Sequence, residues 1–264
     1  MSSPDSPFPE VQPPQVELPA PPPRDPVWSG WDVVMILVVA ILGILVFGGI
    51  ISAGLATTHH VVQGAAAIVL GVVVQCLSYC VVVLFMRGLV VRHYHRGFAE
   101  AVHWRWPGEH RWLVFAVAGM ALSLVVELVS SRLPIPRTLP IDKYFQGRGA
   151  VYALSLFGIS MAPLVEELFF RGFLYPVLAR RMGIPLAVPF TALAFALVHA
   201  LQLGFAWAPI LMLFIVGLVL TIVRVVTANV VPGFLMHVGY NFMLFAMLYI
   251  ATDHFRHMER MLQQ

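Results

Sequence analysis

Seven long apolar runs dominate this sequence and restrict what it can fold into. Only 11% of the 264 residues are charged, against about 25% in soluble domains, and the mean hydropathy is +0.85. A helix needs about 20 apolar residues to cross the hydrocarbon core, and backbone polar groups in lipid must pair within the segment. We therefore expect an all-α polytopic membrane bundle. The runs are Val33–Leu55, Val61–Met86, Trp112–Ser130, Ala150–Ala179, Pro185–Leu203, Pro209–Val226 and Val230–Ala251.

The fourth run, Ala150–Ala179, is too long for one straight crossing. Thirty helical residues rise about 45 Å, whereas the hydrocarbon core is about 30 Å thick. Pro163 removes one helical hydrogen bond, so a kink or a split is expected near it. The sequence thus predicts seven to eight transmembrane helices around a membrane-embedded cavity.

The domain organisation follows from composition. Residues 1–27 are predicted to be a Pro-rich disordered tail, since ten prolines fall among the first 26 residues. Residues 28–252 form the transmembrane helical domain, whose motif-bearing part is 150–251, and 253–264 are a short C-terminal tail. The lipid bilayer is the expected partner, and the net charge of +3 requires no nucleic acid. The short chain and short loops favour a prokaryotic plasma membrane.

Arginine-rich segments give a prediction for orientation. The segment 87–111, the turn at 180–181 and Arg224 fall on one side of a seven-pass arrangement, which would be cytoplasmic. The loop 132–149 carries further basic residues on the opposite side and weakens this asymmetry.

Two adjacent glutamates, Glu166 and Glu167, interrupt the fourth run. A carboxylate at the centre of a membrane helix costs about 2.5 to 3.5 kcal/mol on insertion scales. Polar contacts between membrane helices return only about 0.6 kcal/mol on average. Because structural contacts do not offset this cost, the pair indicates chemistry.

The two glutamates are expected to differ in role. Glu167 and Arg171 lie at i, i+4 with the acid first, the favoured order for an ion pair on a helix. Glu166 is rotated by about 100° and can face a different cavity with less charge compensation. We expect Glu166 to act as a general base, and Glu167 with Arg171 to give structural and electrostatic support.

Two of the ten histidines, His199 and His237, lie deep inside apolar runs. Phe195 precedes His199 by one helical turn, and Asn241 follows His237 by one turn. Residues at i and i+4 share a helix face, so His237 and Asn241 are expected to point into the same space.

Together these side chains suggest hydrolysis by an activated water molecule. Glu166, with His199, would take a proton from the water. His237 and Asn241 would stabilise the oxyanion, a contribution of about 3 to 4 kcal/mol per donor in known cases. No metal and no other cofactor are expected.

The same residues resemble a known family, the CAAX protease and bacteriocin-processing family of intramembrane glutamic endopeptidases, which includes the type II CAAX prenyl endopeptidases. The resemblance implies a helical bundle with a conical cavity open toward one side of the membrane. It also implies that Glu166 and His199 activate water, and that His237 and Asn241 form the oxyanion hole. Phe195 would support the site. The matching motifs are Glu166-Glu167-x-x-x-Arg171, Phe195-x-x-x-His199 and His237-x-x-x-Asn241.

Other functions fit part of the pattern. Two glutamates and two histidines could bind zinc as in a membrane metalloprotease, although the chain has no HExxH spacing. A transporter or proton relay also buries such residues, but usually has repeated halves or broken helices. A member that binds peptides without cleaving them, for example in immunity, is the third alternative. For the protease, the expected substrate is a membrane-associated or lipidated peptide.

Overall fold

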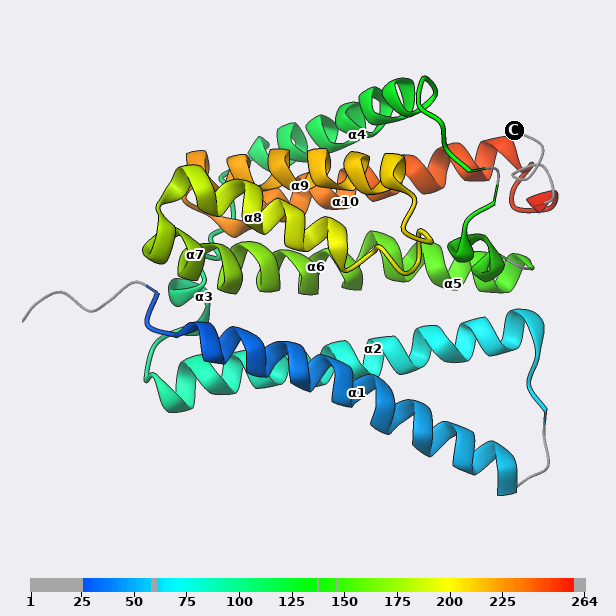
Figure 1. The fold of residues 1–264 in the computed structure, drawn as a ribbon, viewed down its shortest axis with the longest axis horizontal. Helices are drawn as coiled ribbons and strands as arrows, with labels where there is room; N and C mark the ends of the chain where they lie inside the picture. Colours follow the sequence, from blue (N-terminus) through cyan, green and yellow to red (C-terminus); the bar gives the residue numbers. More distant parts are fainter. Residues whose placement is uncertain (1–25, 58–60, 137, 146, 259–264) are drawn as a thin grey trace, which may run out of the picture.

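The computed structural model describes residues 26–57, 61–136, 138–145 and 147–258, and within those residues every element of regular secondary structure is a helix (Figure 1). The predicted tail, 1–27, therefore lies outside the described residues except for its last two. The elements are α1 (Gly30–Thr57), α2 (Gly64–Gly88), η1 (Leu89–His93), α3 (Phe98–Ala101), α4 (Arg111–Ser130), η2 (Pro140–Tyr144), α5 (Arg148–Ile159), α6 (Met161–Glu167), η3 (Leu168–Leu174), α7 (Tyr175–Met182), α8 (Ile184–Leu197), α9 (Trp207–Thr227) and α10 (Val230–Ala251).

Six helical segments are long and apolar enough to cross a membrane, and α8 is a shorter apolar helix. The six are α1, α2 with η1, α4, the continuous segment from α5 to α7, α9 and α10. The predicted all-α membrane bundle is confirmed, and the chain is an integral membrane protein. The predicted end of the fifth run is wrong, because α8 stops at Leu197 and turns follow to Phe205. At 14 residues α8 rises only about 21 Å.

The segment from α5 to α7 breaks near Pro163, as predicted. Helix α5 ends at Ile159, and Ser160 departs from ideal helical dihedral angles with φ −116° and ψ −76°. Pro163 has no N–H to donate to the Ile159 carbonyl, which weakens the helix at this point. A π-helical stretch, η3, follows α6 and carries Arg171. The glutamate pair therefore lies on a short helix between two irregularities (Figure 1).

Helices α4 and α10 cross in backbone contact. A Cβ atom on Gly119 would lie 1.9 Å from the Met236 carbonyl oxygen, and one on Gly239 would lie 2.0 Å from the Ala116 carbonyl oxygen. Only glycine permits such an approach, which is how membrane helices gain packing without a hydrophobic driving force. This crossing fixes α10, the helix that carries His237.

Helices α1 and α2 form a hairpin beside the remaining helices (Figure 1). Its N-terminal end is held by Trp28, whose indole N–H donates to the Phe173 carbonyl at 3.1 Å and whose ring stacks on Phe173. Asp32 accepts hydrogen bonds from Ser29 and from the Tyr94 hydroxyl. These contacts join α1 to η3 and to the segment after η1.

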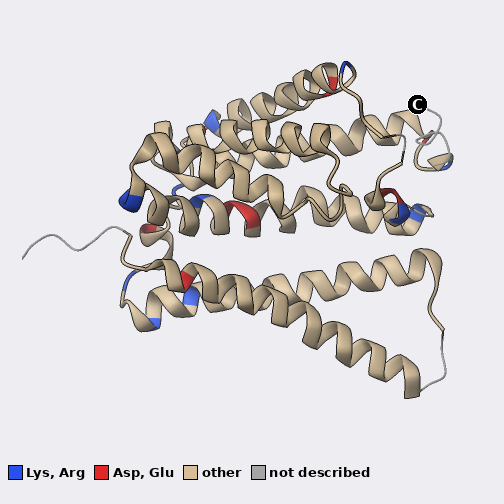
Figure 2. Ribbon diagram, in the orientation of Figure 1, with Lys and Arg blue, Asp and Glu red and all other residues tan. Residues whose placement is uncertain are grey.

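Charged residues gather mainly at the two ends of the bundle, and the acidic patch within α6 is the glutamate pair (Figure 2). The arginine-rich segment 87–111 meets the turn between α9 and α10, since the Arg105 amide donates to Asn229 and the Val230 amide donates to the His103 carbonyl. Arg224, taken above as a topology signal, is buried, and its Nε–H donates to the Arg171 carbonyl at 3.3 Å.

Candidate functional site

A cavity of about 810 Å³ lies between α2, α5, α6, α9 and α10. Five of the seven predicted site residues line it, whereas Glu167 and Arg171 lie behind its wall. Most of the remaining lining is apolar. The predicted residues in the lining are Glu166, Phe195, His199, His237 and Asn241.

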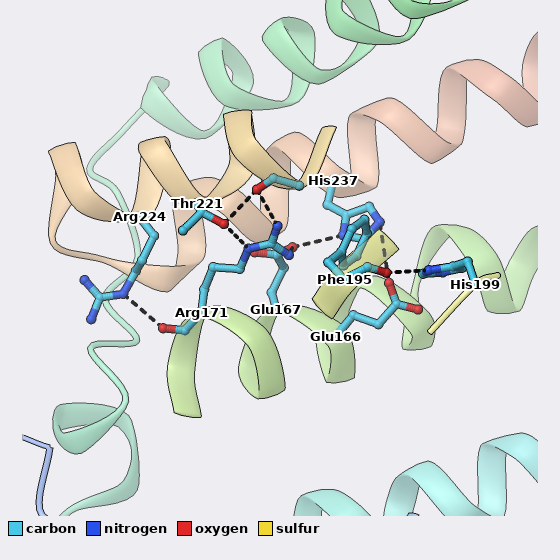
Figure 3. A network of polar contacts seen from close by, with 9 residues as sticks. Glu166, Glu167, Arg171, Phe195, His199, Thr221, Arg224 and His237 are labelled. Carbon is cyan, nitrogen blue, oxygen red and sulfur yellow. Dashed lines mark hydrogen bonds and ion pairs between the residues drawn. The ribbon is translucent and has the colours of Figure 1, made fainter. Parts of the chain in front are cut away.

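Glu167 and Arg171 form the predicted ion pair. Arg171 Nη1 donates to Glu167 Oε1 at 2.8 Å, and neither side chain is exposed. Glu166 is rotated away from this pair, keeps 17% of its side chain accessible and lines the cavity. Figure 3 shows the division, with Glu167 and Arg171 facing α9 and Glu166 extending toward the side of His199. The predicted difference in environment between the two carboxylates is confirmed.

His237 lies between the two carboxylates. Its Nδ1 is 3.1 Å from Glu167 Oε1, and its Nε2 is 3.8 Å from Glu166 Oε2. Because a carboxylate paired with Arg171 accepts, His237 Nδ1 is the protonated donor in the first contact. The second distance exceeds that of a direct hydrogen bond but keeps the two groups within ion-pair range. His237 therefore links the buried ion pair to the glutamate in the cavity.

His199 lies in the turn after α8, and not within a helix as predicted from the apolar run. Its Nδ1 is 2.8 Å from the Phe195 carbonyl oxygen, and its backbone N–H bonds to Ala196 instead. The imidazole thus takes the place of the backbone donor that would have continued the helix. Since a carbonyl only accepts, Nδ1 carries a proton, and Nε2 of the neutral ring keeps a lone pair.

Asn241 follows His237 by one turn of α10, and both line the cavity as predicted. Its amide Nδ2 donates to the Gly158 carbonyl at 2.6 Å, at the end of α5. This bond fixes the orientation of the carboxamide, with its NH₂ group toward Gly158. The second amide hydrogen remains for another acceptor.

Helix α9 supplies residues that the sequence motifs did not indicate. Thr221 Oγ1 accepts from Arg171 Nε at 3.3 Å, and the Gly217 carbonyl accepts from Arg171 Nη2 at 2.9 Å. The guanidinium also lies over the Phe195 ring, 4.8 Å from its centroid. A sequence signal existed, because Thr221 and Arg224 are polar residues three apart inside an apolar run. It did not specify a partner for either residue.

Among the described residues, no group of three or more His, Cys, Asp and Glu side chains is arranged as a metal site. Of the two carboxylates near His237, Glu167 is bound to Arg171.

Residues 148–243, a little over a third of the chain, match the family model described as type II CAAX prenyl endopeptidase Rce1-like. The match includes every predicted site residue. No curated protein and no solved structure matches the chain. The match agrees with the resemblance seen in the motifs, and residues 148–243 of this integral membrane protein are similar to the Rce1-like type II CAAX prenyl endopeptidases.

Proposed function

We propose that this protein is a metal-independent intramembrane endopeptidase of the glutamic type, which hydrolyses a peptide bond with water activated by Glu166 and His199. One observation carries the proposal. Glu166, His199, His237 and Asn241 line the same cavity, and Glu166 Oε2 is 3.8 Å from His237 Nε2. The family match supports proteolysis as the class of reaction.

The reaction begins with proton removal from water. The Glu166 carboxylate, assisted by the lone pair on His199 Nε2, accepts a proton as the water oxygen bonds to the substrate carbonyl carbon. The proton then passes to the amide nitrogen as the C–N bond breaks, which yields a carboxylic acid and an amine. Glu166 returns to its starting state, so water is the only other reactant consumed.

The oxyanion formed in this step needs donors. His237 Nε2–H and the second amide hydrogen of Asn241 are the donors that we assign. With its Nδ1–H donating to Glu167, His237 would offer Nε2–H to the oxyanion in its doubly protonated form.

The substrate that we propose is a membrane-associated or lipidated peptide. The cavity is mostly apolar away from the polar residues, with contributions from Val72, Leu154, Met212 and Leu244. Apolar walls of this kind can bind the lipid chain or apolar side chains of such a peptide. We further propose that the protein acts in a prokaryotic plasma membrane.

The test compares membrane peptides from cells that produce wild-type protein or Glu166→Gln. The glutamine keeps the shape of Glu166 and loses its ability to accept a proton. Glu127→Gln is the matched control, because Glu127 is an exposed carboxylate on α4 that does not line the cavity. We expect uncleaved peptides to accumulate only with Glu166→Gln. Equal peptide profiles for wild type and Glu166→Gln would refute the proposal.

The metal alternative is tested with purified protein in liposomes. We expect cleavage to persist in excess EDTA. Activity that is lost with the chelator and restored by zinc would replace the proposal with a zinc metalloprotease.

A further inference from the structure

Helix α9, which carries none of the family motifs, makes polar contacts with the buried Arg171 on η3. Thr221 Oγ1 accepts from Arg171 Nε at 3.3 Å and itself donates to the Gly217 carbonyl at 2.7 Å. The same carbonyl accepts from Arg171 Nη2 at 2.9 Å. Thr221 and Gly217 are one turn apart on α9, so a single helix face presents both acceptors.

The guanidinium is thereby fixed in three directions. Nη1 points to Glu167 on its own helical segment, Nε and Nη2 point to α9, and the flat face lies over Phe195. Arg171 is fully buried, so no solvent can take the place of these partners. A long side chain that would otherwise have many rotamers is held in one.

The orientation of Arg171 determines the orientations of the Glu167 carboxylate and the His237 ring. Its Nη1 holds Glu167 Oε1, and the same oxygen accepts from His237 Nδ1 at 3.1 Å. The other oxygen of Glu167, Oε2, has no hydrogen-bond partner among the described residues, so Oε1 alone makes this link. A displacement of the guanidinium would therefore move the Glu167 carboxylate and change the ring angle of His237.

We propose that Thr221 is a positioning residue for the proposed hydrolysis, acting through Arg171 and Glu167 to orient His237 in the cavity. Thr221 does not line the cavity, and thus it does not touch substrate. The inference rests on the proposed function for its kinetic consequence. The orientation of His237 can be measured without any substrate.

The chain offers a matched control in Thr191 on α8. Thr191 is also fully buried, and its hydroxyl donates to the carbonyl four residues earlier, at 2.7 Å. Thr221 makes the same bond within its own helix. The two threonines differ in that Thr221 also accepts a hydrogen bond from Arg171 Nε. Thr→Val at either position keeps the shape and removes the hydroxyl, so only Thr221→Val leaves the Arg171 Nε–H without its acceptor.

The first measurement is nitrogen NMR of histidine-labelled protein in detergent micelles, with the His237 signals identified by their loss in His237→Gln. We expect Thr221→Val to shift both ring-nitrogen signals of His237. Thr221→Ser and Thr191→Val are expected to leave these signals in place. Thr221→Ala is a second hydroxyl-free variant in case the valine variant does not fold. Unchanged His237 signals in the hydroxyl-free variants would overturn the proposal.

The second measurement is the cleavage of an internally quenched peptide that carries an S-farnesyl cysteine. Thr221→Val is expected to lower kcat about tenfold and to change KM less than twofold, because the cavity wall is intact. Thr221→Ser is expected to restore kcat to within about threefold of wild type. Equal losses in Thr221→Val and Thr191→Val would mean that Thr221 has only a structural role. Full activity of Glu166→Gln would refute the hydrolytic mechanism, while the NMR result would still decide the role of Thr221.

Discussion

Removing the positive charge from the buried ion pair is expected to destabilise the protein strongly. In Arg171→Met the side chain keeps a similar length but loses its charge and all three hydrogen bonds. Glu167 then remains as a carboxylate with no exposed surface that has lost its arginine and keeps only the contact with His237 Nδ1 at 3.1 Å. Helix α6 offers it no other cation, since its sequence is MAPLVEE.

The magnitude follows from the cost of a buried carboxylate that has lost its arginine partner. Insertion scales give about 2.5 to 3.5 kcal/mol for a charge at the centre of a membrane helix. Breaking a buried pair in soluble proteins costs about 3 to 5 kcal/mol. The lost hydrogen bonds to α9 add only about 0.6 kcal/mol each, the average for membrane helices. We therefore expect a loss of about 3 to 5 kcal/mol, which arises mainly from the uncompensated charge on Glu167.

The assay is a double-mutant cycle on thermal unfolding in detergent micelles. A loss of about 3 to 5 kcal/mol corresponds to a decrease in Tm of about 6 to 20 °C for a domain of this size. Glu167→Gln leaves Arg171 unpaired and is expected to cost a similar amount. The double variant Glu167→Gln/Arg171→Met carries neither charge, so we expect it to melt within a few degrees of wild type.

Two results would refute this reasoning. The first is an Arg171→Met variant whose Tm lies within about 2 °C of wild type, since Glu167 would then not be a buried charge. The second is a double variant that melts below both single variants, because the stabilisation would then come from packing and hydrogen bonds and not from charge compensation.

Three further predictions concern other parts of the structure. Gly239→Ala places a Cβ 2.0 Å from the Ala116 carbonyl oxygen, so we expect a loss of about 1 to 3 kcal/mol in unfolding free energy and reduced cleavage; unchanged melting would show that the helix crossing is not close-packed. Asn241→Ala is expected to lower kcat about 10²-fold with little change in KM, and a loss below about threefold in steady-state kinetics would remove it as an oxyanion donor. Burial and the hydrogen bond to Asp32 raise the pKa of Tyr94 from 10.0 to about 12, so the stability that this bond contributes is present below pH 10 and is lost as the pH rises toward 12. Tyr94→Phe is expected to cost about 1 kcal/mol in unfolding free energy at pH 7 and to remove that pH-dependent loss, which melting curves at pH 7 and pH 11 would detect.

The sequence by itself determined the features that depend on local spacing. Run length and the need to pair backbone groups in lipid specified an all-helical membrane protein. The i, i+4 spacing placed Glu167 beside Arg171 and rotated Glu166 toward another environment, and both expectations are confirmed. Helical geometry relates such neighbours directly, so no knowledge of the packing was needed.

Only the tertiary structure decided how the separate helices meet. His237 lies 70 residues from Glu167 in sequence, and its place between two carboxylates follows from the packing of α10 against α6, where a Cβ on Gly233 would lie 3.0 Å from Glu167 Oε2. The turn at His199 could not be predicted from hydropathy, because the imidazole competes with the backbone for one carbonyl. Thr221 gave no local sign of its partner, since a hydroxyl that bonds within its own helix contacts Arg171 only when α9 packs against η3.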